Sequence, residues 1–142
     1  QVQRVMDELT EKAERRGVEL RNEVPAGMSA HADSGRLQQV LTNLVDNAMK
    51  YGRENGCVIV EAETNGNEVI LSISDDGPGI PLDARERVFE RFYRIDKARS
   101  REQGGTGLGL SIVKHIVQAH GGGVWVDTSA ANGAKFCLTL PV

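Results

Sequence analysis

Four glycines fall within the six residues from Gly104 to Gly109, and an apolar helical pattern starts directly behind them. Glycine adopts positive φ at little cost and lets backbone amides approach a ligand closely. The N-terminus of a following helix presents unpaired N–H groups and the positive end of the helix dipole. The segment is therefore a candidate anion site suited to phosphate, although an ordinary flexible loop would have the same composition.

Two asparagines and a lysine share one side of a predicted long helix. The apolar residues of this helix, from Leu37 to Met49, recur at the spacing of a single buried face. At roughly 100° per residue, Asn43, Asn47 and Lys50 form a polar stripe that borders this face. The stripe is either a plain solvated surface or a site where amide oxygens hold Mg²⁺ and the lysine meets a phosphate.

A carboxylate ends a predicted strand at Asp75, and a turn containing Gly77 and Gly79 follows. One interpretation is an ordinary Asp-Gly turn. The other is that Asp75 accepts a hydrogen bond from the amino group of a base, with the glycines letting the chain turn tightly beside the ring.

Two aromatic residues, Phe89 and Phe92, lie three positions apart in the charged stretch from Pro81 to Gln103. They are either core residues or anchors that hold a loop against the domain. Residues 97–103 are polar apart from Ala98, so we expect this part of the stretch to be mobile.

The elements that must position these segments are predicted from hydrophobic periodicity and turn residues. In chain order we first expect an amphipathic helix ended by Gly17, a strand over 18–23, a short piece near 30–32 placed to pair with that strand, and a long helix capped by Asp33 or Ser34. Strands over 57–63 and 69–74 should follow, joined through Asn65-Gly66. The last elements should be a helix over about 109–120 and strands over 124–128 and 135–140, joined through Asn132-Gly133. Clustered hairpins with few helices favour an α/β sandwich with a mostly antiparallel sheet covered on one face.

The length and composition of the chain exclude several classes of function. The chain has 142 residues, which suits one domain, and its net charge of −3 argues against a nucleic-acid surface. It contains no apolar run of the ~20 residues needed to cross a bilayer, and no signal-like N-terminus. The two cysteines are expected to be small buried residues in a reducing compartment, and with the three histidines they offer no metal-ligand spacing.

Four segments, in order, resemble the sequence boxes of sensor histidine kinases. Asn43 to Tyr51 resembles their N box, Asp75 to Gly79 the G1 box, Phe89 to Phe92 the F box and Gly105 to Leu110 the G2 box. One box alone is weak, but the ordered set is specific and covers essentially the whole chain. The chain thus resembles the ATP-binding catalytic domain of that family, which has the Bergerat fold of the GHKL ATPases. The sequence has no GxxxxGK[ST] loop, so the phosphate cradle is of a different kind.

The resemblance implies a two-layer α/β sandwich, with a mixed, mostly antiparallel sheet covered on one face by about three helices. It implies one domain over 1–142 and an ATP lid at about 81–105. In the adenine region, Asp75 would bind the amino group and Tyr51 would line the ribose–adenine side. Gly77 and Gly79 would shape that wall, and Ile80 is expected among the nucleotide-binding residues.

At the phosphates, the resemblance implies that Asn47 holds Mg²⁺ and that Asn43 positions the triphosphate. Lys50 would contact it, and Arg94 would reach the γ-phosphate from the lid. Asn43, Lys50 and Arg94 are the expected catalytic residues. The backbone of the glycine loop would bind phosphate, with nucleotide-binding residues at Gly105, Thr106, Gly107, Leu108, Gly109 and Leu110.

The function implied by the resemblance is to bind ATP·Mg²⁺ and donate the γ-phosphoryl group to a histidine on a separate dimerisation and histidine-phosphotransfer domain. A cognate response regulator is a further expected partner, and no contact with nucleic acid or directly with a membrane is expected. The location would be cytoplasmic, with anchoring of the parent protein in the inner membrane left open.

No histidine of the chain has the sequence context of a phosphate acceptor. His31, His115 and His120 are expected in structural or solvated roles, so the chain alone should not phosphorylate itself on histidine. Two other classes stay open: an anti-sigma-factor-type serine kinase or other ATPase of the same fold, and a non-catalytic module whose pocket only signals occupancy.

Overall fold

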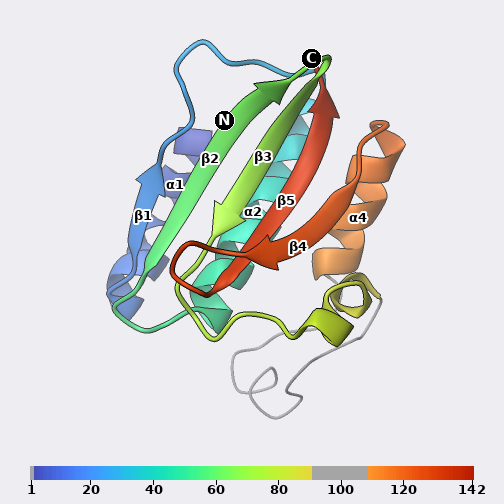
Figure 1. Cartoon of the computed structure of the whole chain (residues 1–142). Helices are drawn as coiled ribbons and strands as arrows, with labels where there is room; N and C mark the ends of the chain where they lie inside the picture. The colour runs from blue at the N-terminus through green and yellow to red at the C-terminus, as the bar shows by residue number, and fades with distance from the viewer. Residues whose placement is uncertain (1, 91–108) are drawn as a thin grey trace.

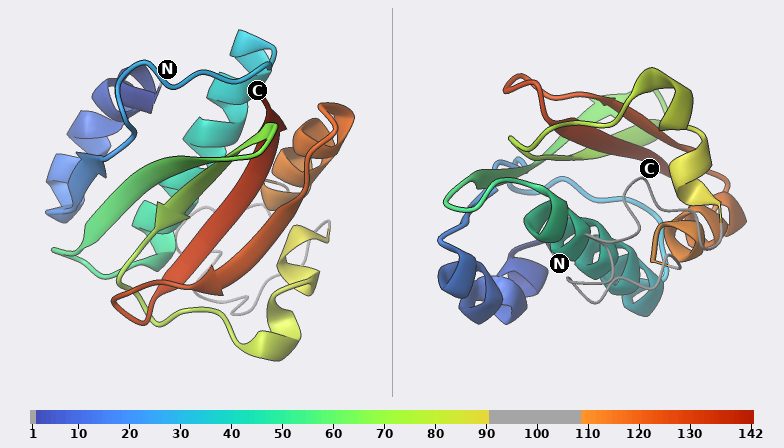
Figure 2. Two further views of the ribbon diagram at one scale, coloured as in Figure 1. Left: turned by 45° about the horizontal axis from the view of Figure 1, so that its top comes forward. Right: turned by 90° about the horizontal axis from the view of Figure 1, so that it is seen from below.

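The structure, a computed structural model, describes residues 2–90 and 109–142 of the chain. These described residues form two layers, a five-stranded sheet and three α-helices that cover one of its faces (Figures 1 and 2). The view from below shows the sheet as one layer and the three helices side by side as the other (Figure 2, right). This arrangement confirms the expected α/β sandwich.

The three helices are α1 (Val2–Arg16), α2 (Ser34–Tyr51) and α4 (Gly109–Ala119), and α2 packs against both of the others. Asp33 rather than Ser34 caps α2, because its side chain accepts a hydrogen bond from the backbone N–H of Arg36 at 2.9 Å. The predicted apolar face of α2 is confirmed. Its buried residues are Val40, Leu41, Leu44, Val45, Ala48 and Met49.

The sheet is mixed and mostly antiparallel, as expected. Its strands are β1 (Glu19–Asn22), β2 (Cys57–Asn65), β3 (Glu68–Ser74), β4 (Val124–Thr128) and β5 (Ala134–Pro141), and their spatial order is β1-β2-β3-β5-β4. Only β1 and β2 pair in parallel. Both predicted hairpins form, although Asn65 pairs with Glu68 and the first turn therefore consists of Gly66 and Asn67.

The prediction for residues 30–32 is wrong. The backbone N–H of His31 donates to the carbonyl of Pro141 in β5 at 2.7 Å, and β1 pairs only with β2 among the described strands. The reason is the path of the segment between β1 and α2. The chain leaves β1 at the edge of the sheet and must cross the end of the sheet to start α2 behind the central strands (Figure 1). That crossing carries residues 30–32 away from β1.

Between β3 and α4 the described residues include two short 3₁₀ turns, η1 (Leu82–Ala84) and η2 (Arg87–Phe89). Phe89 is buried, and its ring packs edge-on against Phe136 of β5 with the centroids 6.1 Å apart. Phe89 is thus a core residue that holds the first part of the predicted lid against the domain. Phe92, the segment 97–103 and most of the predicted lid lie outside the described residues.

None of the helices in the described part of the chain combines the length and the apolar character needed to cross a membrane. The cysteines are free: Cys137 is buried as expected, whereas Cys57 is only half-buried at the start of β2.

Candidate functional site

The end of α2 lies directly against the strand end that carries Asp75. A Cβ built on Gly52, the residue after α2, would lie 3.5 Å from the Asp75 Cβ. A Cβ built on Gly77 would lie 2.8 Å from both the Gly52 Cα and the Tyr51 carbonyl oxygen. Glycine is therefore required at position 77, because any side chain would separate the Asp75 turn from the helix.

The middle of α2 lies near the start of α4. A Cβ built on Gly109, the first residue of α4, would lie 3.9 Å from the side-chain Oδ1 of Asn43. The side chains of Asn43 and Asn47, which we call the carboxamide row of α2, therefore have the N-terminus of α4 at one end and the Asp75 turn at the other. Leu110, in the first turn of α4, is partly buried and packs against the core.

Asp75, the residue expected to bind adenine, is a buried carboxylate, and backbone N–H groups hold one of its two oxygens in place. The residue is 6% exposed, and Oδ1 accepts hydrogen bonds from the backbone N–H groups of Gly77 at 2.9 Å and Ala134 at 3.1 Å. Oδ2 receives no hydrogen bond from any described residue. Because an acceptor without a partner is costly when buried, this oxygen is suited to a donor on a ligand.

Burial raises the pKa of Asp75. The two backbone N–H groups oppose this rise, because they stabilise the charged form, and the nearby charge of Asp76 adds to it. Asp76 itself turns away from this region, since its Oδ2 accepts a hydrogen bond from the backbone N–H of Cys57 at 3.1 Å. The two adjacent carboxylates therefore have different structural roles.

Two residues of the β4–β5 connection support Asp75 and were missed by the sequence reasoning. The hydroxyl of Ser129 donates to the backbone carbonyl of Asp75 at 2.7 Å and accepts from the N–H of Gly133 at 2.8 Å. A Cβ on Gly133 would lie 2.6 Å from Oδ1 of Asp75. The Asn132-Gly133 pair indicated only a turn, and no sequence signal connects it with a residue more than fifty positions away.

The other predicted adenine-side residues lie close to this turn. Gly79 has φ of +78°, which explains a glycine there, and a Cβ on it would lie 3.2 Å from the carbonyl of Asn132. Ile80 is half-buried and packs against the core, and Tyr51 is half-buried at the last position of α2.

On α2 the polar stripe is half-buried, and its lysine is not free. Asn43 and Asn47 are both of intermediate exposure. The Nζ of Lys50 lies 3.2 Å from Oδ2 of Asp46, one turn earlier in the helix. The stripe is thus not a plain solvated surface, and an acidic residue that the sequence reasoning did not consider belongs to it.

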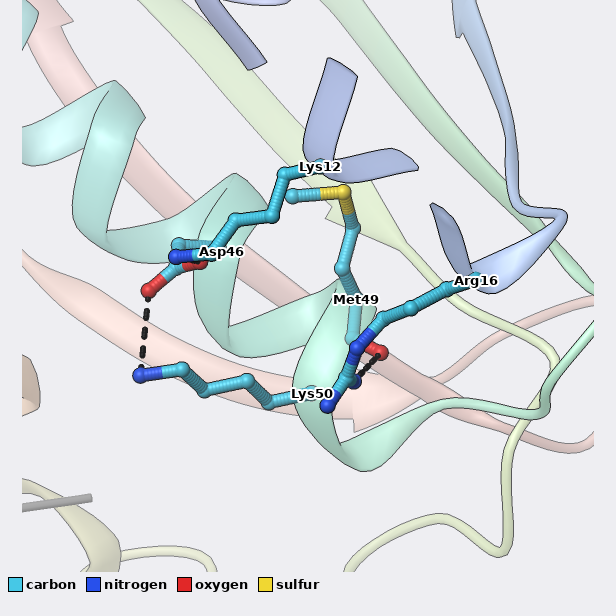
Figure 3. A network of polar contacts seen from close by, with 5 residues as sticks. All are labelled: Lys12, Arg16, Asp46, Met49 and Lys50. Carbon is cyan, nitrogen blue, oxygen red and sulfur yellow. Dashed lines mark hydrogen bonds and ion pairs between the residues drawn. The ribbon is translucent and has the colours of Figure 1, made fainter. Parts of the chain in front are cut away.

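Helix α1 supplies two cations to the same part of α2 (Figure 3). Lys12 Nζ donates to Oδ1 of Asp46 at 2.8 Å, and Arg16 Nη1 donates to the carbonyl of Met49 at 2.8 Å. The sequence does place Lys12 and Arg16 four residues apart on an amphipathic helix. This spacing did not predict their contacts with α2, because such basic residues usually mark a solvated face.

Among residues 2–90 and 109–142, no group of three or more histidine, cysteine, aspartate or glutamate side chains could hold a metal ion. One carboxamide oxygen at Asn47 nevertheless fits Mg²⁺, which keeps several waters and binds mainly through substrate phosphates. Arg94 and the glycine-loop residues Gly105, Thr106, Gly107 and Leu108 lie outside the described residues, so their roles stay predictions.

The comparisons with known proteins agree with this geometry. Residues 32–142 match the family described as histidine kinase-, DNA gyrase B- and HSP90-like ATPases. The sensor histidine kinase WalK of Bacillus subtilis (strain 168) is 45% identical over 124 residues, which are 86% of this chain and 20% of WalK. The chain therefore spans about a fifth of that relative.

Solved structures give the same result. The nucleotide-free catalytic domain of histidine kinase ThkA has a TM-score of 0.86 and 32% identity, over 99% of this chain and 89% of that one. ThkA in complex with the response regulator protein TrrA has a TM-score of 0.82 and 30% identity, over 99% and 39%. Full-length ShkA in complex with AMPPNP has a TM-score of 0.85 and 35% identity, over 99% and 29%. The chain belongs to the family of histidine kinase-, DNA gyrase B- and HSP90-like ATPases and is a catalytic domain of the histidine kinase type.

Proposed function

We propose that the chain binds ATP with Mg²⁺ and donates the γ-phosphoryl group to a histidine on a separate dimerisation domain, as part of two-component signalling. The observation that carries the proposal is the buried Asp75 carboxylate, one oxygen of which has no partner among the described residues, next to the end of α2. The solved complex of the related ShkA with AMPPNP, an ATP analogue, supports the nucleotide.

Asp75 would select adenine through its free oxygen. Oδ1 is held by two backbone N–H groups, so Oδ2 points in one fixed direction and accepts from an exocyclic amino group. A hydrogen bond to a charged acceptor contributes about 1.5–3 kcal/mol. Guanine presents a carbonyl oxygen where adenine has its amino group, so the same carboxylate would repel it.

The phosphates would extend from Asp75 along α2 toward the start of α4. Asn43 would position them and Lys50 would neutralise part of their charge. The first turn of α4 would add its unpaired N–H groups and helix dipole. Mg²⁺ held by Asn47 would neutralise further charge, and Arg94 with Gly105, Thr106, Gly107 and Leu108 would complete the site.

The chain would align the triphosphate and neutralise its negative charge, because phosphoryl transfer needs little covalent help from the protein. The nucleophile and its base would come from the dimerisation domain. The proposal assigns no residue of the chain as a base for water, so hydrolysis of ATP by the chain alone should be slow.

A response regulator is the second proposed partner. ThkA, a relative of matching fold, has been solved with the response regulator TrrA. The regulator would take the phosphoryl group from the histidine, and the chain's own part would end with the first transfer. A cytoplasmic location follows from these partners.

Calorimetric titration of Mg-ATP into the chain, with and without EDTA, tests the binding step. Transfer is tested by offering a histidine-bearing dimerisation hairpin in parallel with a serine substrate. Label on the hairpin alone supports the histidine kinase role, label on serine favours the anti-sigma-factor type of kinase, and binding without any transfer favours a module that only signals occupancy.

A further inference from the structure

One carboxylate in the nucleotide region is shared by lysines from two helices. Asp46 of α2 has Lys12 Nζ of α1 at 2.8 Å from Oδ1 and Lys50 Nζ of α2 at 3.2 Å from Oδ2. Figure 3 shows both lysines reaching this single side chain, Lys12 from the neighbouring helix and Lys50 from the next turn of α2. Each carboxylate oxygen therefore has its own cation.

Lys50 lies between two possible sets of partners on α2. With Leu37 set at 0°, Asp46 falls at roughly 180°, Lys50 at roughly 220° and the two asparagines at roughly 240° and 280°. The lysine therefore has the carboxylate on one side and the carboxamide row on the other. A small change in its side-chain rotamers would move the ammonium from Asp46 to a phosphate held at that row.

The cost of that move depends on Asp46. Its side chain is only 22% exposed, and each of its two oxygens has a lysine ammonium group within 3.2 Å. A partly buried carboxylate that loses its only cation is penalised, whereas one that keeps a second cation is not.

We propose that Lys12 is a positioning residue of the nucleotide site: it keeps Asp46 neutralised, and so allows Lys50 to exchange that carboxylate for a phosphate. The proposal rests on the proposed function, since it concerns how Lys50 becomes available to ATP. Arg16 supports it from the same face of α1, because its bond to the Met49 carbonyl fixes α1 beside the last turns of α2.

The test is a double-mutant cycle on Mg-ATP affinity with the wild-type chain, Lys12→Met, Lys50→Met and the double variant. Lys12→Met should weaken binding about two- to fivefold, the range for a partly exposed ion pair. In the Lys50→Met background, Lys12→Met should leave the affinity for Mg-ATP unchanged, because the Lys50 ammonium that Lys12 makes available is already absent. Equal weakening in both backgrounds, or none in the wild-type background, overturns the proposal.

Two further readouts separate positioning from a structural or long-range effect. Adenosine, which has no phosphate, should bind all four proteins equally, and a loss of adenosine affinity in Lys12→Met would overturn the proposal. Arg15→Met is the matched control: it removes one charge from the same helix, where Arg15 pairs with Glu11 at 2.6 Å. A loss as large as that of Lys12→Met would also overturn it.

Failure of the proposed function gives a different result. In that case the wild-type chain itself binds no Mg-ATP, and both proposals fall together. If the wild-type chain binds and the cycle shows no coupling between Lys12 and Lys50, only the role of Lys12 is rejected.

Discussion

The backbone N–H of Ala134, the first residue of β5, donates to Oδ1 of Asp75 at 3.1 Å. The bond joins residues that are 59 positions apart, and it forms only when β3 and β5 pair in their observed register. Together with the N–H of Gly77 it occupies Oδ1, and Oδ2 is left without a donor from the part of the chain that the structure describes. The sheet itself thus sets the direction of the proposed adenine contact.

Asp75→Asn tests that contact. The amide oxygen of asparagine would take over the two backbone N–H groups, which places its NH₂ where Oδ2 was, facing the donor of adenine. We expect ATP affinity to fall by about 1.5–3 kcal/mol, with discrimination against GTP lost. Calorimetry with both nucleotides measures the two effects.

Asp76→Asn is the matched control for this substitution. Asp76 accepts from the N–H of Cys57 and carries the same charge one position later, so its variant should bind ATP like the wild-type chain. An equal loss of ATP and GTP affinity in Asp75→Asn would contradict the adenine assignment.

The raised pKa of Asp75 predicts a pH dependence with opposite signs for stability and binding. Because burial raises the folded-state pKa above the unfolded value, the folded protein binds the proton more tightly. The contribution of Asp75 to the free energy of unfolding therefore grows as the pH falls through the folded pKa, and is lost as the pH rises through it. Adenosine binding should weaken over the same fall, because the protonated carboxyl is a poorer acceptor.

Adenosine titrations carried downward from neutral pH check this prediction, because a raised pKa places the change above the ordinary range of an aspartate. Asp75→Asn has no carboxyl to titrate, so its weaker affinity should stay constant. An identical pH profile for the two proteins would show that another group is responsible.

Much of this site could be predicted from the sequence, because its parts are local patterns. The stripe of Asn43, Asn47 and Lys50 follows from helical periodicity, and the position of Asp75 follows from the end of a strand pattern. The order of the boxes along the chain then indicated that these parts belong together. The structure places Asn43 beside Gly109 and Asp75 beside Gly52 in agreement with this.

What could not be predicted depends on pairing between distant segments. Ser129 contacts Asp75 across 54 positions, and Lys12 contacts Asp46 across 34. Such contacts are set by strand register and helix packing, which a single sequence does not specify. The wrong placement of residues 30–32 has the same origin, since local patterning cannot tell which strand end a crossing segment will meet.

Gly133→Ala tests whether the turn at β5 supports Asp75. Its Cβ would meet the carboxylate oxygen at 2.6 Å and the Asp75 backbone as well, and neither can move without breaking the hydrogen bonds of the turn. We expect a loss of about 2 kcal/mol in the free energy of unfolding and a Tm about 6–10 °C lower. Gly123→Ala is the control, because nothing lies within 4 Å of a Cβ there. Equal shifts in the two variants would mean that the glycine at position 133 is not needed for packing against Asp75.

The histidines of the chain should not become phosphorylated by its own ATP. His120 accepts from the N–H of Asp33 through Nε2 at 3.1 Å and lies with Nδ1 2.8 Å from the Ile116 carbonyl, so its lone pair is already used. The N–H of His31 bonds to β5, and its Nδ1 lies 3.1 Å from the carbonyl of Val142. These contacts agree with the expected structural or solvated roles of His120 and His31, and both His31 and His115 are exposed.

Incubation with labelled Mg-ATP should therefore leave no acid-labile phosphate on the chain, while an added histidine-bearing dimerisation hairpin becomes labelled. His31 and His115 are both exposed, but Nδ1 of His31 already lies 3.1 Å from the Val142 carbonyl, so His115 is the histidine to test first. Label on the chain alone that disappears in His115→Gln would contradict the prediction. That result would also place the acceptor within this domain rather than on a separate one, since a nucleophile on α4 would not need the hairpin.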